Sequence, residues 1–109
     1  MKFKSNVIVN DDEIVVIEHT KSILSSNVED NRISIPTHLV KLVQKAYTDE
    51  EGISSVAIFF ETEDEFFFTQ DDIEEDLETL FNQLLEIKQK RNIFRVEEYN
   101  IKTKTTIDK

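Results

Sequence analysis

The chain has 109 residues, no cysteine and a net charge of −10 at pH 7. This length suits one domain with a single core, and the lack of cysteine excludes disulfides and thiolate metal sites. No run approaches the roughly 20 apolar residues of a membrane span, and the first residues do not resemble a signal peptide. We therefore expect a cytoplasmic protein that does not associate with membranes.

The negative charge is concentrated in one part of the chain. Residues 46–87 carry fourteen acidic residues and no lysine or arginine, whereas the other residues include thirteen basic and nine acidic ones. Such an anionic segment repels nucleic acids and acidic membranes and attracts basic proteins. We therefore expect no direct binding to DNA or RNA.

The first predicted element is a β-hairpin, in which two β-branched runs, 7–9 and 14–17, flank a polar turn at 10–13. Residues 22–31 are polar and predict a loop or a short edge strand, and residues 32–35 could add a strand. Pro36 suits the first turn of a helix. Leu39, Val43, Ala46 and Tyr47 share a helical face, which predicts a helix ending before Gly52.

A second hairpin is predicted from residues 54–61 and 65–69, around a turn at 62–64. If residues near 61 and 66 oppose each other, strict alternation gives two apolar faces. These faces hold Phe59, Phe66 and Phe68 on one side, and Ile58, Phe60 and Phe67 on the other. Such a strand pair is either covered on both faces or leaves one face uncovered for a partner.

The longest helix is expected to begin at Thr69, in the capping-box-like stretch TQDD, and to end near Arg91 before Asn92. Its apolar positions are Ile73, Leu77, Leu80, Phe81, Leu84 and Ile87. NIFRVEEYNI predicts a last strand, and the basic tail 102–109 is expected to fray. The order ββ(β)αββαβ indicates one α+β domain over residues 1–109, with an antiparallel sheet of about five strands packed by two helices.

The residue pattern argues against an enzyme. A single glycine excludes a P-loop and a dinucleotide fingerprint. No nucleophile-elbow pattern accompanies His19 or His38, which we expect to be surface residues. Zinc ligands at short spacing are missing, and ETEDEFFFTQDD lacks the central glycine of an EF-hand loop. We expect no catalytic residue, no metal site and no cofactor.

Helix stability explains only some of the acidic residues. Negative charge in the first turns of the expected helix favours its dipole by roughly 0.3–1 kcal/mol per charge, but the acids of the second hairpin have no such role. Over residues 71–78 the carboxylates reach one charge per roughly 2 Å, close to the value of about 1.7 Å for duplex DNA. The candidate partner-binding residues are Glu61, Glu63, Asp64, Glu65, Asp71, Asp72, Glu74, Glu75, Asp76 and Glu78.

These features favour a non-enzymatic binding protein with a basic protein as its partner. The first hypothesis is an inhibitor or immunity-type protein, of the kind encoded by bacterial phages and mobile elements. It would block a basic nuclease or other nucleic-acid-handling enzyme with a DNA-mimic-like surface, as anti-CRISPR proteins do as a class. The alternative is an adaptor or assembly protein, in some cases a homodimer, that binds through the Phe-rich hairpin or an edge strand. Salt-sensitive binding favours the inhibitor.

Overall fold

The computed structural model describes residues 3–21 and 27–109, so residues 22–26 of the expected loop lie outside the described residues. No helix in the described ranges is long and apolar enough to cross a membrane. The elements in chain order are β1 (Asn6–Val9), β2 (Glu13–Lys21), β3 (Val28–Pro36), the 3-10 helix η1 (Thr37–Leu39), β4 (Val40–Thr48), β5 (Gly52–Phe60), β6 (Glu65–Thr69), α1 (Leu77–Arg91), β7 (Arg95–Asn100) and β8 (Thr105–Asp108).

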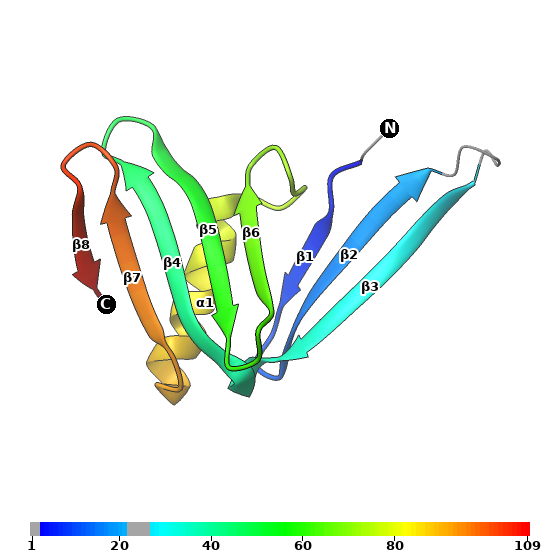
Figure 1. Ribbon diagram of the computed structural model, residues 1–109, viewed down its shortest axis with the longest axis horizontal. Coiled ribbons are helices and arrows are strands. Elements are labelled where there is room, and N and C mark those ends of the chain that lie inside the picture. The colour runs from blue at the N-terminus through cyan, green and yellow to red at the C-terminus, as the bar shows by residue number, and fades with distance from the viewer. Residues whose placement is uncertain (1–2, 22–26) are drawn as a thin grey trace.

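The strands form two sheets rather than one (Figure 1). The first sheet has the order β1-β2-β3 and is antiparallel. The second has the order β6-β5-β4-β7-β8, and its central pair, β4 and β7, runs parallel. The α+β class and both predicted hairpins are confirmed, whereas the prediction of one antiparallel sheet packed by two helices is wrong.

The expected helix after Pro36 is a strand. Residues 37–39 form only the short η1, and β4 follows, paired with β5 on one side and β7 on the other. Val40 and Val43 are fully buried, as expected for β-branched residues in a central strand. A spacing of four residues fits a strand as well as a helix, because an even number of residues returns to the same strand face, and here pairing with β5 and β7 decides for the strand.

The long helix begins at Leu77, eight residues later than expected, and Asp76 is its N-cap. The Asp76 carboxylate accepts a hydrogen bond from the backbone N–H of Thr79 at 3.1 Å. The stretch TQDD forms a turn instead, in which the Asp72 carboxylate accepts from the backbone N–H and the hydroxyl of Thr69. The predicted end of the helix is confirmed: Asn92 has a left-handed φ of 51° and its N–H donates to Lys88.

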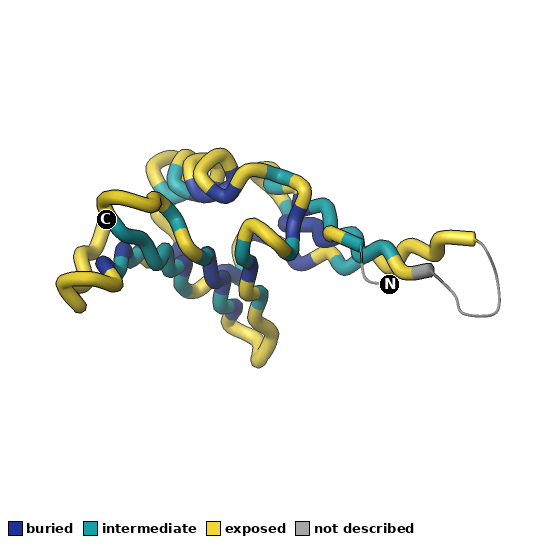
Figure 2. The backbone as a smooth tube through the Cα atoms, turned by 90° about the horizontal axis from the view of Figure 1, so that it is seen from above, coloured by how far each residue is buried: buried dark blue, intermediate teal, exposed yellow. Residues whose placement is uncertain are grey.

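The helix α1 covers one face of the five-stranded sheet and leaves the other face uncovered (Figure 2). Its apolar stripe packs in one core cluster with residues of both sheets. The buried residues of that stripe are Leu77, Leu80, Phe81, Leu84 and Ile87. The residues from the sheets include Val7, Ile14, Val16, Val43, Val56, Ile58 and Val96.

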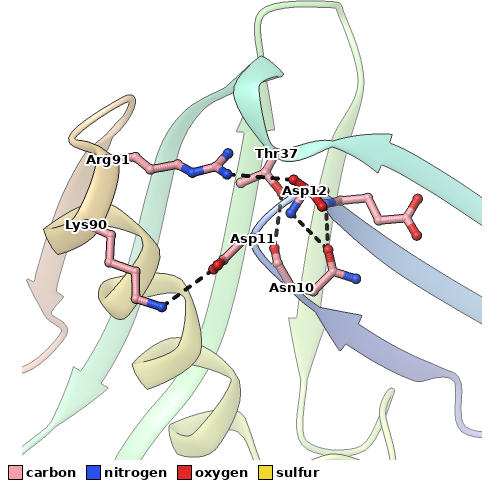
Figure 3. A network of polar contacts seen from close by, with 7 residues as sticks. Asn10, Asp11, Asp12, Thr37, Lys90 and Arg91 are labelled. Atoms are coloured by element: carbon pink, nitrogen blue, oxygen red, sulfur yellow. Dashed lines mark hydrogen bonds and ion pairs between the residues drawn. The ribbon is translucent and has the colours of Figure 1, made fainter.

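The β1–β2 turn is fixed to η1 and to the end of α1 (Figure 3). Asn10 Oδ1 accepts from the backbone N–H of Asp12 at 2.9 Å, and the buried Thr37 donates its N–H to the Asp12 carbonyl at 2.9 Å. Two exposed ion pairs add little stability but orient the turn toward the helix. They are Lys90–Asp11 at 3.8 Å and Arg91–Asp12 at 3.6 Å.

The C-terminal tail is paired rather than frayed. The buried Asn100 accepts hydrogen bonds from the backbone N–H groups of Lys102 and Thr103, which closes a turn after β7. The chain then returns as β8, antiparallel to β7. The expectation that residues 102–109 fray is therefore wrong, because the Asn100 side chain closes a turn whose signal in the sequence was missed.

A charged cluster lies on the face of the sheet that α1 covers. Lys45 Nζ is 2.5 Å from one carboxylate oxygen of Glu98, and Lys109 Nζ is 3.1 Å from the other. The Lys45 ammonium also lies 4.8 Å from the ring centre of Tyr47 and 4.7 Å from that of Phe81. Burial raises the pKa of Glu98, but the hydrogen bonds from Lys45 and Lys109 outweigh it, so the pKa is below its usual value.

The lowered pKa of Glu98 predicts a specific loss of stability in acid. A carboxyl group with a lower pKa in the folded state contributes stability above its unfolded pKa, and this contribution is lost as the pH falls through the folded value. We expect Glu98→Gln to lower the free energy of unfolding near neutral pH by at least about 1 kcal/mol and to flatten its decline in acid. Urea unfolding at a series of pH values measures both effects.

The matched control is Glu50→Gln, because Glu50 forms an exposed ion pair with Lys102 at 2.9 Å. Exposed pairs contribute little, so this variant should match the wild type at neutral pH. Equal unfolding free energies for Glu98→Gln and the wild type would show that the cluster is not stabilising.

The buried stripe of α1 gives a second prediction. Leu80 is 1% exposed, so Leu80→Ala should cost about 2–5 kcal/mol, as usual for large-to-small core changes. The neighbouring Gln83 is exposed, and Gln83→Ala should change stability by no more than about 0.5 kcal/mol. Chemical unfolding compares the two variants, and a loss below about 1 kcal/mol for Leu80→Ala would contradict this packing.

Candidate functional site

The β5–β6 hairpin places Phe59 and Phe67 on the uncovered face of the sheet, and of these two Phe67 is the exposed one. Phe59 is opposite Glu65, and Ala57 is opposite Phe67. We expected residues near 61 and 66 to lie opposite each other. The observed pairing of β5 with β6 is shifted from that register by an odd number of residues. Relative to β5, each β6 side chain therefore lies on the opposite face of the sheet from the one expected. Phe68 is therefore buried and Phe67 is 63% exposed.

A shallow hollow of about 240 Å³ lies on the uncovered face beside Phe67. Small side chains of β4 and β5, Ala46, Ser55 and Ala57, line it together with the aromatic rings of Phe67 and Tyr99. The volume is below the range of roughly 300–1,000 Å³ that is usual for small-molecule pockets. The hollow therefore suits a side chain of a protein partner. The signal missed in the sequence was the alternation of small residues in β5.

The ten candidate acidic residues fall into two groups at opposite ends of β6 (Figure 1). The turn group consists of Glu61, Glu63, Asp64 and Glu65, all exposed. The loop group consists of Asp71, Asp72, Glu74, Glu75, Asp76 and Glu78. The four steps of β6 span roughly 13 Å at about 3.3 Å per residue, and the first acid of the loop group, Asp71, comes two residues after this strand. Adjacency in the sequence therefore does not make them one continuous patch.

Three residues of the loop group have structural roles. Asp76 caps α1, and Asp72 closes the turn after β6. Glu75 connects this loop to the first sheet, because its carboxylate accepts from the backbone N–H of Val7 at 2.6 Å and from the Asn6 amide at 3.0 Å. Reversing the charge of these three residues would therefore disturb the fold. Their roles could not be read from the sequence because they depend on the position of β1.

The surroundings of the two groups also differ. Asp76 and Glu78 line a hollow that also includes Glu51, from the β4–β5 turn, so acidic residues from two segments meet there. Glu61, in contrast, shares a hollow with Lys88 and Arg95. No group of three or more acidic or histidine side chains among residues 3–21 and 27–109 has the arrangement of a metal site.

The two histidines differ in their surroundings, and His19 is linked to Glu75 of the loop group through the side chain of Asn6. His38 is exposed. The His19 ring is partly exposed and lies between two side chains, with Nδ1 at 2.6 Å from Asp30 Oδ1 and Nε2 at 2.7 Å from Asn6 Oδ1. These contacts hold the ring against the first sheet.

The observed register predicts opposite effects at two neighbouring phenylalanines. Phe68→Ala should cost about 3–5 kcal/mol because the ring is in the core, whereas Phe67→Ser should change stability by less than about 1 kcal/mol. Urea unfolding of both variants measures the difference. A larger loss of stability for Phe67→Ser than for Phe68→Ala would show that β6 pairs with β5 in the opposite register.

Neither protein-family models, nor curated proteins, nor solved structures gave a match to this chain. Its residues and their geometry are therefore the basis for inferring its function.

Proposed function

We propose that this chain is a non-enzymatic, cytoplasmic binding protein that inhibits a basic, nucleic-acid-handling enzyme. The observation that carries the proposal is the exposed Phe67 on an uncovered sheet face, with acidic residues at both ends of its strand. This combination has the anatomy of a protein interface, in which an apolar centre is surrounded by a polar rim.

The apolar centre would supply most of the binding free energy. Aromatic residues that insert into or border a small hollow commonly dominate binding energy, and Phe67 and Tyr99 border the hollow on this face. The neighbouring sheet surface is built from small side chains, so a large side chain from the partner can approach the backbone closely.

The acidic rim would supply steering and partner choice. Rim charges raise association rates and select partners of opposite charge more than they deepen binding. The two acidic groups lie at opposite ends of β6, so negative charge flanks the aromatic centre on two sides. This placement supports a DNA-mimic-like mode in which the protein occupies the nucleic-acid site of its partner.

A second candidate function is an adaptor that binds by strand addition at β6. This strand is at the edge of the five-stranded sheet, and edge strands offer unpaired backbone groups to a partner. An adaptor of this kind would bind with little salt dependence and would leave its partner active.

Charge reversal in the turn group tests the inhibitor proposal. Glu63 and Glu65 are exposed and outside the core, so Glu63→Lys with Glu65→Lys should leave the fold intact. Compared with the wild type, the double variant should retain at least about ten-fold less of a basic partner from source-cell extract, because the electrostatic attraction that steers the partner is lost. Immobilised protein, washed at about 0.05 M and 0.5 M salt, provides the measurement.

The control carries the same charge change elsewhere, as Glu86→Lys with Asp108→Lys, at exposed positions of α1 and β8, and should retain the partner like the wild type. Nucleic-acid processing by the retained enzyme, with and without added protein, then separates the two candidate functions. Full activity in the complex would favour the adaptor. Equal retention by both double variants, or direct binding of duplex DNA by the protein itself, would overturn the proposal.

A further inference from the structure

The two outer edges of the three-stranded sheet differ in how they are covered. The β1 edge is closed by the loop before α1: Ser5 donates its N–H to the Asp72 carbonyl and accepts from the N–H of Glu74, both at 2.9 Å. Further along, the Val7 N–H donates to the Glu75 carboxylate at 2.6 Å. The β1 edge therefore has no room for another strand at these positions.

The β3 edge is open. β3 pairs with β2 alone and is the outermost strand of its sheet, and Figure 1 shows it at the margin of the molecule, away from α1. Its residues 28–32 are all exposed. With nine residues, it is as long as any strand of the fold, and a long open edge is the usual template for pairing with another chain.

The register shows which backbone groups of β3 face outward. The Thr37 N–H donates to the Asp12 carbonyl at 2.9 Å, in continuation of the β2–β3 register. Because hydrogen-bonded pairs alternate in an antiparallel ladder, the odd-numbered residues of β3 bond to β2 and the even-numbered ones face outward. Pro36 agrees with this alternation, since it lacks an N–H and occupies an outward position. The outward residues before it are Val28, Asp30, Arg32 and Ser34.

Two of these outward residues carry opposite charges on either side of Asn31. Asp30 contacts His19 through one carboxylate oxygen only. Arg32 is exposed, and its side chain has no ion pair or hydrogen bond with another residue of the described ranges. In an antiparallel pair related by a two-fold axis through Asn31, Asp30 of each copy lies opposite Arg32 of the other.

We propose that the partner on this edge is a second copy of the chain, joined β3 to β3 about Asn31 to form a continuous six-stranded sheet. Residues 28–34 of each copy form the interface, with two Asp30–Arg32 pairs and facing Asn31 amides at the centre. Because only the even-numbered residues face outward, the nearest alternative pairings shift one strand by two residues. These pairings place Asp30 opposite Asp30 or Arg32 opposite Arg32. Like charges directly opposite each other are destabilising, so the sequence favours a single register.

The net charge of −10 does not prevent this contact. The fourteen acids without a compensating base lie in residues 46–87, which contribute to the other sheet, to α1 and to the loop along the β1 edge, and none of them is in β3. Charges beyond about 8 Å are largely screened at physiological salt. The contact is small, so a dimer that dissociates in the micromolar range or above is expected.

Charge exchange within the interface tests the proposal. Sedimentation of the full chain over rising concentration should show a monomer–dimer equilibrium. Asp30→Arg alone and Arg32→Asp alone should each raise the dissociation constant by roughly ten-fold or more, since two pairs become repulsive. The double exchange, Asp30→Arg with Arg32→Asp, restores opposite charges and should return the dissociation constant to within about three-fold of the wild type.

A backbone variant tests the strand pairing itself. Ser34 faces outward, so Ser34→Pro removes an N–H that β2 does not use and should abolish the dimer while the monomer keeps its circular dichroism spectrum. A chain that stays monomeric at about 1 mM, or a dimer unaffected by Ser34→Pro, would overturn the proposal. Glu63→Lys with Glu65→Lys should leave the dimer unchanged, which separates this proposal from the proposed inhibitor function.

Discussion

One helix has to cover the apolar faces of two sheets, and this constraint determines which surfaces remain open. The stripe from Leu77 to Ile87 is buried in the cluster shared by both sheets. Nothing comparable is available for the second face of the five-stranded sheet, because α1 is the only α-helix in the described ranges. A sheet covered on one face alternates between large core residues and small or polar ones. The alternation of Val56, Ile58 and Phe60 with Ser55 and Ala57 follows that rule.

The junction between the sheets depends on a few buried polar contacts. Thr37 is fully buried and bonds to the backbone of the β1–β2 turn, so β3 and β4 are fixed on either side of η1. Glu75 performs a related role at the other end of β1. These contacts explain why several acids of the loop group have structural roles. The same carboxylate-rich segment therefore joins the two sheets and also carries exposed charge at Asp71, Glu74 and Glu78.

The sequence predicted the elements whose signals are local. Both hairpins, the apolar stripe of α1 and its end at Asn92 follow from turn residues and periodicity over short stretches. β4 was predicted wrongly because Leu39, Val43 and Tyr47 satisfy helical spacing, while the deciding factor was pairing with β7, which lies about fifty residues later in the chain. The helix start was misplaced because both Thr69 and Asp76 are good capping residues, and only packing chooses between them.

The candidate site was predicted in composition but not in arrangement. The register of the β5–β6 hairpin depends on its turn, and a shift by one residue exchanges the faces of Phe67 and Phe68. The acids of the turn group lie before α1 begins at Leu77, so helix capping does not account for them. The division of the acids into two groups follows from the five-residue length of β6, and the roles of Asp72 and Glu75 follow from the position of β1. Such long-range relations cannot be derived from local pattern.

The two proposed surfaces are on different sheets, and this separation has a functional consequence. Pairing through β3 would leave the β5–β6 hairpin of each copy uncovered, because β3 and β6 belong to different sheets. The dimer would then carry two identical acidic, aromatic surfaces. A partner with two equivalent sites, or two partners on one nucleic acid, would be held by both surfaces at once, and the linkage would raise the apparent affinity without any new contact. Loss of the β3 pairing would in that case weaken retention through avidity and leave the affinity of each single surface unchanged.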